Sequence, residues 1–278
     1  MKRAFLVLAG LLLITGVAFS QISLKLTGGM AYISGNDLNK GIQGFNDWVT
    51  AETTDPTGKF EKLNMGMNFT GEAIYNLTSN AGIGVGIGYF QMSKDNSVTY
   101  LQGGGVPSTD TFKPTINVMP ITLNFYYYIP TGSSMSVYLK AGAGYYMTKF
   151  DAEYSFSWPL GHGTDTLKVS KGAIGFQGGF GIEIPVSGQA SFVVEAGARY
   201  AKVSELTGDW TSKGNGFFGP WDKSGTGSLW FGDYSSIGGN TYPRVAINND
   251  SPLWLDNVKK ASLDLTGFSI KAGIKIGF

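Results

Sequence analysis

The chain of 278 residues contains no cysteine and a single histidine, His162. Without cysteine it can form no disulfide, thiol nucleophile, thiolate metal site or lipid-modified cysteine. One histidine excludes a multi-histidine metal centre, and we expect neither a metal nor a cofactor. Charge is scarce too, because 15% of residues are charged, against about 25% in average proteins, and the net charge is +1. Nucleic-acid-binding proteins carry a basic surplus, so we expect no nucleic-acid partner.

Long apolar runs are also missing. The run Ala4–Ile14 follows the basic pair Lys2–Arg3, and Ala18–Ser20 places small residues at the positions that a signal peptidase reads. A transmembrane helix needs about 20 apolar residues, and this run is shorter. The sequence therefore predicts that residues 1–20 are a cleaved signal peptide and that residues 21–278 form one domain.

Glycine and aromatic residues are plentiful, with 41 Gly and 14% Phe, Trp and Tyr, and the chain shows a period of two. Between Ile83 and Tyr89, for example, every second residue is apolar and every residue between is glycine. Such alternation is typical of a strand with one apolar and one polar face. Eight stretches follow this pattern: 22–32, 64–77, 82–89, 121–129, 137–146, 174–184, 192–200 and 268–278.

The connections between these stretches alternate in length. Three are tight, near residues 78–81, 130–134 and 185–190, and four are long, roughly 34–63, 93–114, 150–168 and 203–262. Short turns at one end and long loops at the other are typical of an outer-membrane barrel. We therefore expect an all-β fold: an eight-stranded antiparallel up-and-down transmembrane β-barrel with short periplasmic turns, long extracellular loops and both termini on the periplasmic side.

Several short motifs carry a resemblance to a known group. They are Ile83–Tyr89, Met119–Phe125, Ala141–Tyr146 and the terminal Gly273–Phe278. Together with the signal peptide, these segments resemble the small eight-stranded outer-membrane β-barrel superfamily over the mature chain except its loops. The resemblance implies that Phe278 is the terminal signal read by the barrel-assembly machinery, and that the protein resides in the outer membrane of a Gram-negative-type bacterium, in contact with lipid and lipopolysaccharide.

Charged residues on the polar face of the strands would point into the barrel. Eight strands leave an interior just wide enough for side chains to fill, and a buried charge needs a partner. We therefore expect a closed, mutually paired lumen network, with Arg199 beside Glu195 at its centre; a narrow ion path is the alternative. The expected members are Lys25, Glu72, Lys140, Glu183, Glu195, Arg199, Lys271 and Lys275.

Tryptophans gather in the predicted loops. The six are Trp48, Trp158, Trp210, Trp221, Trp230 and Trp254. The last loop holds four of them, and a long loop this rich in aromatics is typical of a folded, functional segment. We expect it to fold over the barrel mouth or to extend the last two strands as a hairpin. These aromatics either pack among the loops or form a surface that binds a glycan, lipopolysaccharide or another protein.

The first loop shows a helical spacing. Apolar residues recur from Leu38 to Val49, after Asn36 and Asp37, which can cap a helix start. Gly41 and Gly44 weaken the pattern, because glycine disfavours a helix interior. A short amphipathic helix on the outer rim is the prediction, and a coil is the alternative.

An enzyme of the lipid-A-modifying kind would need a histidine with a serine and a carboxylate. Only His162 could serve as the base, and it lies between two glycines of a predicted loop near Ser157 and Asp165. A flexible loop is a poor place for a preorganised site, so we expect no catalytic residues. The resulting hypothesis is a non-enzymatic, monomeric barrel that displays loops for envelope integrity, adhesion or recognition. A narrow pore or a conduit for small or hydrophobic compounds is the alternative.

Overall fold

The computed structural model describes residues 21–131 and 135–278, and the predicted signal peptide lies outside the described residues. The described chain is an all-β antiparallel structure with one helix, α2 (Asn36–Glu52). Its strands are β1 (Ile22–Ile33), β2 (Thr54–Gly58), β3 (Met65–Asn76), β4 (Ala81–Ser93), β5 (Asn96–Gln102), β6 (Val106–Pro130), β7 (Ser136–Trp158), β8 (Gly161–Ser187), β9 (Ala190–Ser204), β10 (Thr207–Gly216), β11 (Gly219–Ser235), β12 (Thr241–Asn248), β13 (Asp256–Lys260), β14 (Ser262–Asp264) and β15 (Gly267–Gly277).

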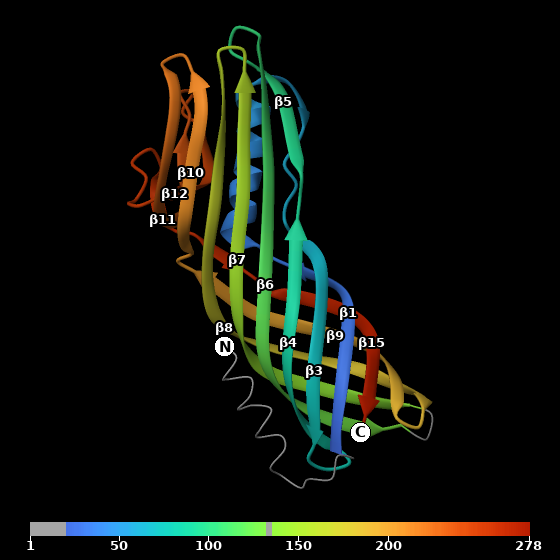
Figure 1. The fold of residues 1–278 in the computed structure, drawn as a ribbon. Coiled ribbons are helices and arrows are strands. Elements are labelled where there is room, and N and C mark those ends of the chain that lie inside the picture. The colour runs from blue at the N-terminus through green and yellow to red at the C-terminus, as the bar shows by residue number, and fades with distance from the viewer. Residues whose placement is uncertain (1–20, 132–134) are drawn as a thin grey trace.

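Eight of these strands pair in a closed circuit. The antiparallel pairings run β1, β3, β4, β6, β7, β8, β9 and β15, and β15 pairs again with β1. In Figure 1 these strands wrap around one another in the lower part of the molecule, where β15 leads to the C-terminus. The circuit matters because a closed ring leaves no unpaired strand edge.

The described residues form fifteen strands, more than the eight expected, and eight of the fifteen make up the circuit. Much of the predicted long loops is strand, and β6 continues to 25 residues. At about 3.3 Å per residue, a strand of that length spans roughly 80 Å, far more than the apolar band of about 25 Å on an outer-membrane barrel. Neighbouring strands keep pairing beyond the ring, so the backbone groups of these segments are satisfied by a continuing ladder.

The segment expected as the last long loop also forms a sheet. After a break at Glu205, whose φ is 59°, β10 resumes pairing with β8 where β9 stops. Next, β11 pairs with β10 and β12, so the sheet grows outward from the ring wall. This segment therefore enlarges the sheet by pairing with the outer end of β8. It does not form the expected hairpin that would continue the last two strands of the ring.

The predicted helix in the first loop is confirmed, but its predicted cap is wrong. Gly35, with a φ of 71°, precedes α2, and no side chain caps the helix start. Gly41 and Gly44 lie where α2 approaches β12, and a Cβ on Gly44 would overlap the Pro243 carbonyl oxygen. The two glycines weaken the helix locally but allow it to approach β12 closely.

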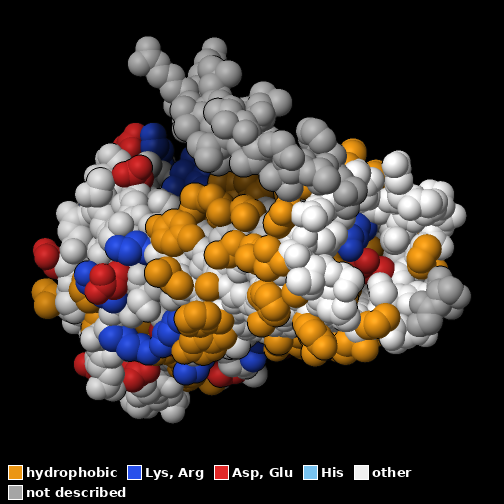
Figure 2. All heavy atoms as spheres, turned by 90° about the horizontal axis from the view of Figure 1, so that it is seen from below, with side chains coloured by type: hydrophobic (Ala, Val, Ile, Leu, Met, Phe, Trp, Pro, Cys, Tyr) orange, Lys and Arg blue, Asp and Glu red, His pale blue; other side chains and the backbone are white. Residues whose placement is uncertain are grey.

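The outward face of the ring is apolar. On β6, Leu123 is 58% exposed, while Thr122 and Asn124 on either side are buried. Figure 2 shows hydrophobic side chains gathered over the middle of the visible face, with charged side chains toward its left-hand edge. A surface of this kind suits a hydrocarbon environment.

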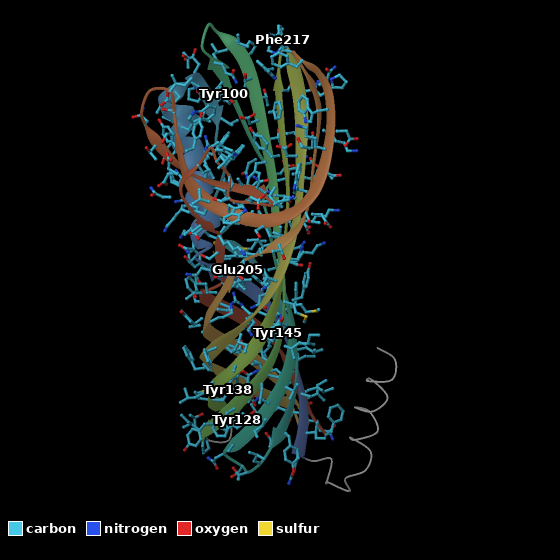
Figure 3. All side chains as sticks on the ribbon, turned by 90° about the vertical axis from the view of Figure 1, so that its left-hand side faces the viewer. Tyr100, Tyr128, Tyr138, Tyr145, Glu205 and Phe217 are labelled. Carbon is cyan, nitrogen blue, oxygen red and sulfur yellow. The ribbon has the colours of Figure 1, made fainter. Side chains whose placement is uncertain are left out.

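Beyond this apolar belt the pattern inverts. On β7 the outward residues become Lys149, Asp151 and Glu153, while Phe150 and Ala152 point inward and are buried. We call the part with an apolar exterior the ring half. The outer half comprises α2, β2, β5, β10–β14 and the outer ends of β6–β8. Figure 3 shows Tyr128, Tyr138 and Tyr145 in the ring half and Tyr100 and Phe217 in the outer half, with Glu205 between.

In residues 21–131 and 135–278, no helix combines the length and apolar character needed to cross a membrane.

Candidate functional site

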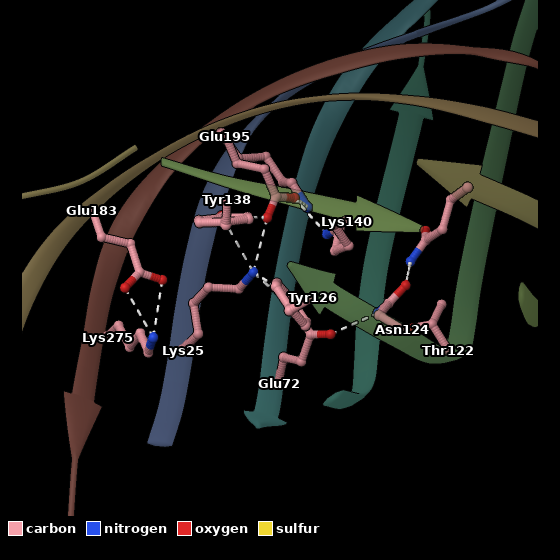
Figure 4. Close-up of polar contacts among 12 residues, drawn as sticks. Lys25, Glu72, Thr122, Asn124, Tyr126, Tyr138, Lys140, Glu183, Glu195 and Lys275 are labelled. Atoms are coloured by element: carbon pink, nitrogen blue, oxygen red, sulfur yellow. Dashed lines mark hydrogen bonds and ion pairs between the residues drawn. The ribbon is translucent and has the colours of Figure 1, made fainter. Parts of the chain in front are cut away.

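Glu195 lies at the centre of the polar side chains inside the ring (Figure 4). Its Oε1 contacts the ammonium groups of Lys140 at 2.7 Å and Lys271 at 2.8 Å. Its Oε2 contacts Lys25 at 2.8 Å and accepts a hydrogen bond from the Tyr138 hydroxyl at 2.8 Å. These four contacts match the roughly four lone-pair sites of a carboxylate. The Glu195 side chain is 1% exposed, so solvent does not compete for it.

A second carboxylate, Glu72, extends the network across the lumen. Lys25 lies 3.2 Å from Glu72, and Asn124 donates to it at 2.6 Å. The Tyr126 hydroxyl donates to Glu72 and accepts a bond from Lys25 at 2.7 Å. Gln177 donates to Asn124 at 2.7 Å, which reaches β8 on the far wall. The network therefore ties together walls that are distant in sequence.

A separate ion pair lies nearer the short-turn end. Lys275 contacts Glu183 at 2.9 Å and donates to the Tyr128 hydroxyl at 3.2 Å. A cavity of about 450 Å³ lies beside this pair at the short-turn end, whereas the space beside Glu195 measures about 40 Å³. Since one water occupies about 30 Å³ of liquid, this space holds about one molecule. We call the charged residues inside the ring the lumen network: Lys25, Glu72, Lys140, Glu183, Glu195, Lys271 and Lys275.

Arg199 is not the centre of this network, contrary to the expectation. Its guanidinium lies over the rings of Phe90 and Tyr146, at 5.1 and 5.7 Å from their centroids. Its Nε donates to the Leu265 carbonyl at 3.0 Å, and the ion pairs of the described residues do not join it to Glu195. Residues four apart on one face of a strand are about 13 Å apart, too far for direct contact.

The outer half contains a much larger cavity, of about 650 Å³. Apolar and aromatic residues from α2, β6, β7, β8, β10, β11 and β12 line most of it. Its aromatic walls are Phe45, Trp48, Phe60, Phe112, Phe150, Tyr154, Trp210, Tyr234 and Trp254. Small-molecule sites are commonly about 300 to 1,000 Å³, mostly apolar, with a few polar groups. This outer cavity has those properties, and in the sequence only the gathering of tryptophans pointed toward it.

Arg244, on β12, supplies the cation of the outer cavity. Its guanidinium lies 4.9 Å from the Phe45 ring centroid, 5.2 Å from Trp48 and 5.7 Å from Tyr234. The ion pairs found in the described residues do not include Arg244. Burial lowers the pKa of Arg244, but an arginine side chain stays charged in proteins.

Sequence reasoning missed Arg244, although one signal was available. Lys and Arg together number 21, but Arg occurs only at positions 3, 199 and 244. Both arginines of the described chain lie over aromatic rings. A guanidinium stacks on aromatic faces and is more weakly hydrated than an ammonium. The rarity of arginine in a lysine-rich chain could have marked both positions.

A buried acid lies near Arg244. Asp110 is 2% exposed and accepts a hydrogen bond from the Tyr100 hydroxyl at 2.9 Å. Burial raises the pKa of Asp110, and the charge of Arg244 opposes that rise. Burial likewise raises the pKa of Tyr154, which keeps this tyrosine neutral. Among the described residues that line the cavity, Arg244 alone has a cationic side chain.

Two carboxylates fix the ends of α2. At its start, buried Asp37 accepts hydrogen bonds from the Ser262 amide at 3.0 Å and hydroxyl at 2.8 Å, and Lys259 lies 3.1 Å away. Burial alone would raise the pKa of Asp37, but these contacts outweigh it and hold the pKa below its usual range. At the other end, Glu52 accepts bonds from Asn240 at 3.0 Å and Tyr242 at 2.9 Å. The helix is thus held as one wall of the cavity.

The six tryptophans all lie in the outer half. Trp48 is on α2, Trp158 ends β7, Trp210 is on β10, Trp221 and Trp230 are on β11, and Trp254 is in a turn. Three of them, Trp48, Trp210 and Trp254, line the outer cavity. The tryptophans therefore divide between cavity walls and packing elsewhere in this half.

His162 and Phe278 occupy strand ends. His162 lies on β8 opposite Ser157, in a strand and not in the flexible loop expected, and it is exposed. No hydrogen bond joins it to Ser157 or Asp165 in the described structure. Groups of three or more metal-binding side chains are absent from the described residues.

Phe278 follows β15, is 52% exposed, and its amide donates to the Ile22 carbonyl at 2.9 Å.

Comparison with known proteins gives the following matches. Residues 6–219 match the family model described as outer membrane protein beta-barrel domain. None of the curated proteins matches the chain. The crystal structure of OprG from Pseudomonas aeruginosa is similar at 14% identity and a TM-score of 0.39, over 92% of this chain and 95% of that one.

Two further solved structures are similar over the same share of the chain. A major outer membrane protein from Thermus thermophilus has 14% identity and a TM-score of 0.41, over 92% of this chain and 99% of that one. The outer membrane protease OmpT from Escherichia coli has 10% identity and a TM-score of 0.35, over 92% of this chain and 96% of that one.

Proposed function

Because the chain belongs to the outer membrane protein β-barrel domain family, we propose that it is a closed, non-enzymatic barrel whose outer half serves recognition at the cell surface. The eight paired strands form the transmembrane barrel in this proposal, with their short turns in the periplasm. The outer half then lies outside the cell. The observation that carries the proposal is the contrast between the cavity of about 40 Å³ beside Glu195, at the centre of the lumen, and the outer cavity of about 650 Å³.

The belt supports this placement in the membrane. Outward residues on β6 are apolar from Met119 to Ile129, a run of the length that tilted barrel strands need, about 9 to 11 residues. Exposed Tyr89 and Tyr145 lie at its outer border. Aromatic girdles mark the interfaces of outer-membrane barrels.

Lipopolysaccharide is the proposed lipid partner at the outer border. Exposed Lys149, Lys168 and Lys171 lie on adjacent strands just beyond the belt. Ammonium groups at that level would face anionic lipid groups, and this arrangement supports the proposal. We further propose that the protein is a monomer, that residues 1–20 are removed on export, and that Phe278 is read by the barrel-assembly machinery.

The lumen network supports a closed barrel. It contains four lysines and three glutamates, all in ion pairs, and lacks the ring of one charge sign used by selective pores. Ions would have to break buried ion pairs to pass. Recognition at the outer half is therefore favoured over a narrow pore or a conduit for small compounds.

Planar-bilayer recording tests the closed lumen. The refolded wild type is compared with a variant lacking residues 207–260, whose junction is short because Ser204 and Ser262 are paired neighbours. We expect no stable conductance steps from either protein, because the lumen network lies below the deleted segment. Discrete steps that persist after the deletion would establish the pore and overturn this proposal. Steps only in the deletion variant would also overturn it, by placing the seal in the outer half.

A further inference from the structure

We infer that the outer cavity binds a small amphiphile with an apolar body and a single anionic group, and that Arg244 holds this anion. This inference rests on the proposed function and gives its recognition role a ligand class. Three features carry it: the shape of the cavity, the lack of an ion-pair partner for Arg244 among the described ion pairs, and the charge of the surrounding wall.

The shape favours a small apolar molecule. The cavity of about 650 Å³ is bounded by α2 on one side and by the inner faces of β6, β7 and β8 on another. Leu38 and Ile42 of α2 face it together with Leu167 and Ile247 from the strands. Burying an acyl chain or fused-ring body against such walls would favour binding, because it removes apolar surface from water.

Arg244 gives the cavity its polar specificity. Arg244 is half-buried, and taking a charge even partly out of water without a partner is costly. Its aromatic neighbours Phe45, Trp48 and Tyr234 offset part of that cost through cation–π contacts. They also hold the planar guanidinium in place, but the ring faces that it contacts cannot accept its charge-assisted hydrogen bonds. Arginine is suited to a carboxylate or phosphate, which it binds through two parallel hydrogen bonds.

The surrounding wall favours one anion and no more. Asp110 and Asp165 are the acids near the cavity, and Asp165 lines it directly. A second anionic group would meet these carboxylates, whereas a single one can sit at Arg244. A neutral ligand would gain the apolar contacts but leave the guanidinium unpaired. The expected ligand is therefore an aliphatic or fused-ring molecule with one anionic head group, either a carboxylate or a phosphate.

The test uses the full-length mature protein in lipid nanodiscs and isothermal titration with matched probes. Decanoate, decyl phosphate and decanol share one alkyl chain and differ in the head group. We expect saturable binding of at least one anion, at least tenfold tighter than decanol. Comparing the two anions tells carboxylate from phosphate. Equal affinity for the anions and decanol, or no binding of any probe, would overturn the inference.

Variants identify the residue. Arg244→Gln is expected to reduce anion affinity to the level of decanol while leaving decanol binding within about twofold. Arg244→Lys should restore part of the difference, because lysine keeps the charge but not the bidentate geometry. The control Lys213→Gln removes a positive charge from an exposed pair in the same half and should change nothing. Unchanged anion binding in Arg244→Gln would overturn the assignment.

Folding is checked independently by the heat-dependent gel mobility typical of folded barrels. If Arg244→Gln fails this check, Ala152→Phe provides a second route, since Ala152 lines the cavity and a larger side chain there would fill it. Ala152→Phe should weaken the anions and decanol alike, and unchanged binding would place the ligand elsewhere. Absence of binding in a non-conducting wild type would reject this inference while leaving the closed barrel intact.

Discussion

The ring half and the outer half share β6, β7 and β8, but their interiors differ in polarity. Along β7, the inward face begins with Tyr138 and Lys140 and continues with Phe150 and Ala152, all buried. The outward face changes in the opposite sense, from exposed Leu139 to exposed Lys149. The strand keeps one face inside throughout, and only the chemistry of the two faces is exchanged.

The exchange follows from what surrounds each half. Lipid is as apolar as leucine, so the ring half gains little by burying apolar side chains, and its inside can hold polar groups if they are paired. The outer half meets water, where burying apolar surface is the main driving force. The ring half is therefore held by hydrogen bonds and ion pairs, and the outer half by an apolar core around α2. This difference predicts that loss of an ion pair lowers the stability of the ring half much more than that of the outer half.

The largest expected effect lies in the lumen network. Glu195→Gln removes the charge that faces Lys25, Lys140 and Lys271, leaving three ammonium groups close together without it. Removing one partner of a buried ion pair costs about 3 to 5 kcal/mol. We expect a loss of that order in the free energy of unfolding, measured by urea titration in lipid vesicles.

A matched control lies in the outer half. Asp222→Asn breaks the Lys213–Asp222 pair, whose side chains are 62% and 67% exposed. Exposed pairs contribute about 0 to 1 kcal/mol, so this change should be nearly silent. A similar loss in both variants would show that the ion pairs of the ring half are no more important than surface ones.

A lysine scan across the belt border should give the next largest effect. Phe176→Lys places a charge on the outward face of β8, level with Leu123 on the paired strands and within the belt. Lysine at the midplane of a barrel destabilises by about 2 to 4 kcal/mol, falling to about 0 to 1 near the interface. Ser170→Lys on the same strand lies beside Lys168 and Lys171, outside the belt, and should have little effect. Equal losses from the two changes in vesicles would mean that the membrane border is misplaced.

Much of the ring half could be predicted from sequence, because its two faces differ sharply in polarity. The stretch from Ile121 to Ile129 alternates between lipid-facing and inward residues, and this signal is local. In contrast, β10 contains few apolar residues, and its sequence resembles a loop. It becomes a strand because the extended β8 offers a ladder of hydrogen-bonding groups, a condition set by the fold and not by the segment.

The same limit applies to the candidate sites. Alternation could place Lys25 and Glu195 inside the ring, but their contact depends on β15 pairing with both β1 and β9, which brings these two strands near one another. Arg199 illustrates the error that results, since it shares a face with Glu195 but lies over aromatic rings and not in the network. The outer cavity was out of reach because Arg244 meets Phe45 about 200 residues away in sequence.

The smallest expected effect concerns the docking of α2 in the outer half. Asp37 has a pKa below its usual range in the folded protein, so its contribution to stability is complete above the unfolded pKa of about 3.9. That contribution is lost as the pH falls through the lower folded pKa. We expect Asp37→Asn to lower the melting temperature of the outer half at about pH 7, where the wild-type carboxylate is charged, and the difference to vanish at low pH, once both side chains are neutral. Tryptophan fluorescence reports this transition because the six tryptophans lie in that half. A difference that stays constant with pH would assign the effect of Asp37 to shape and hydrogen bonding, not to its charge.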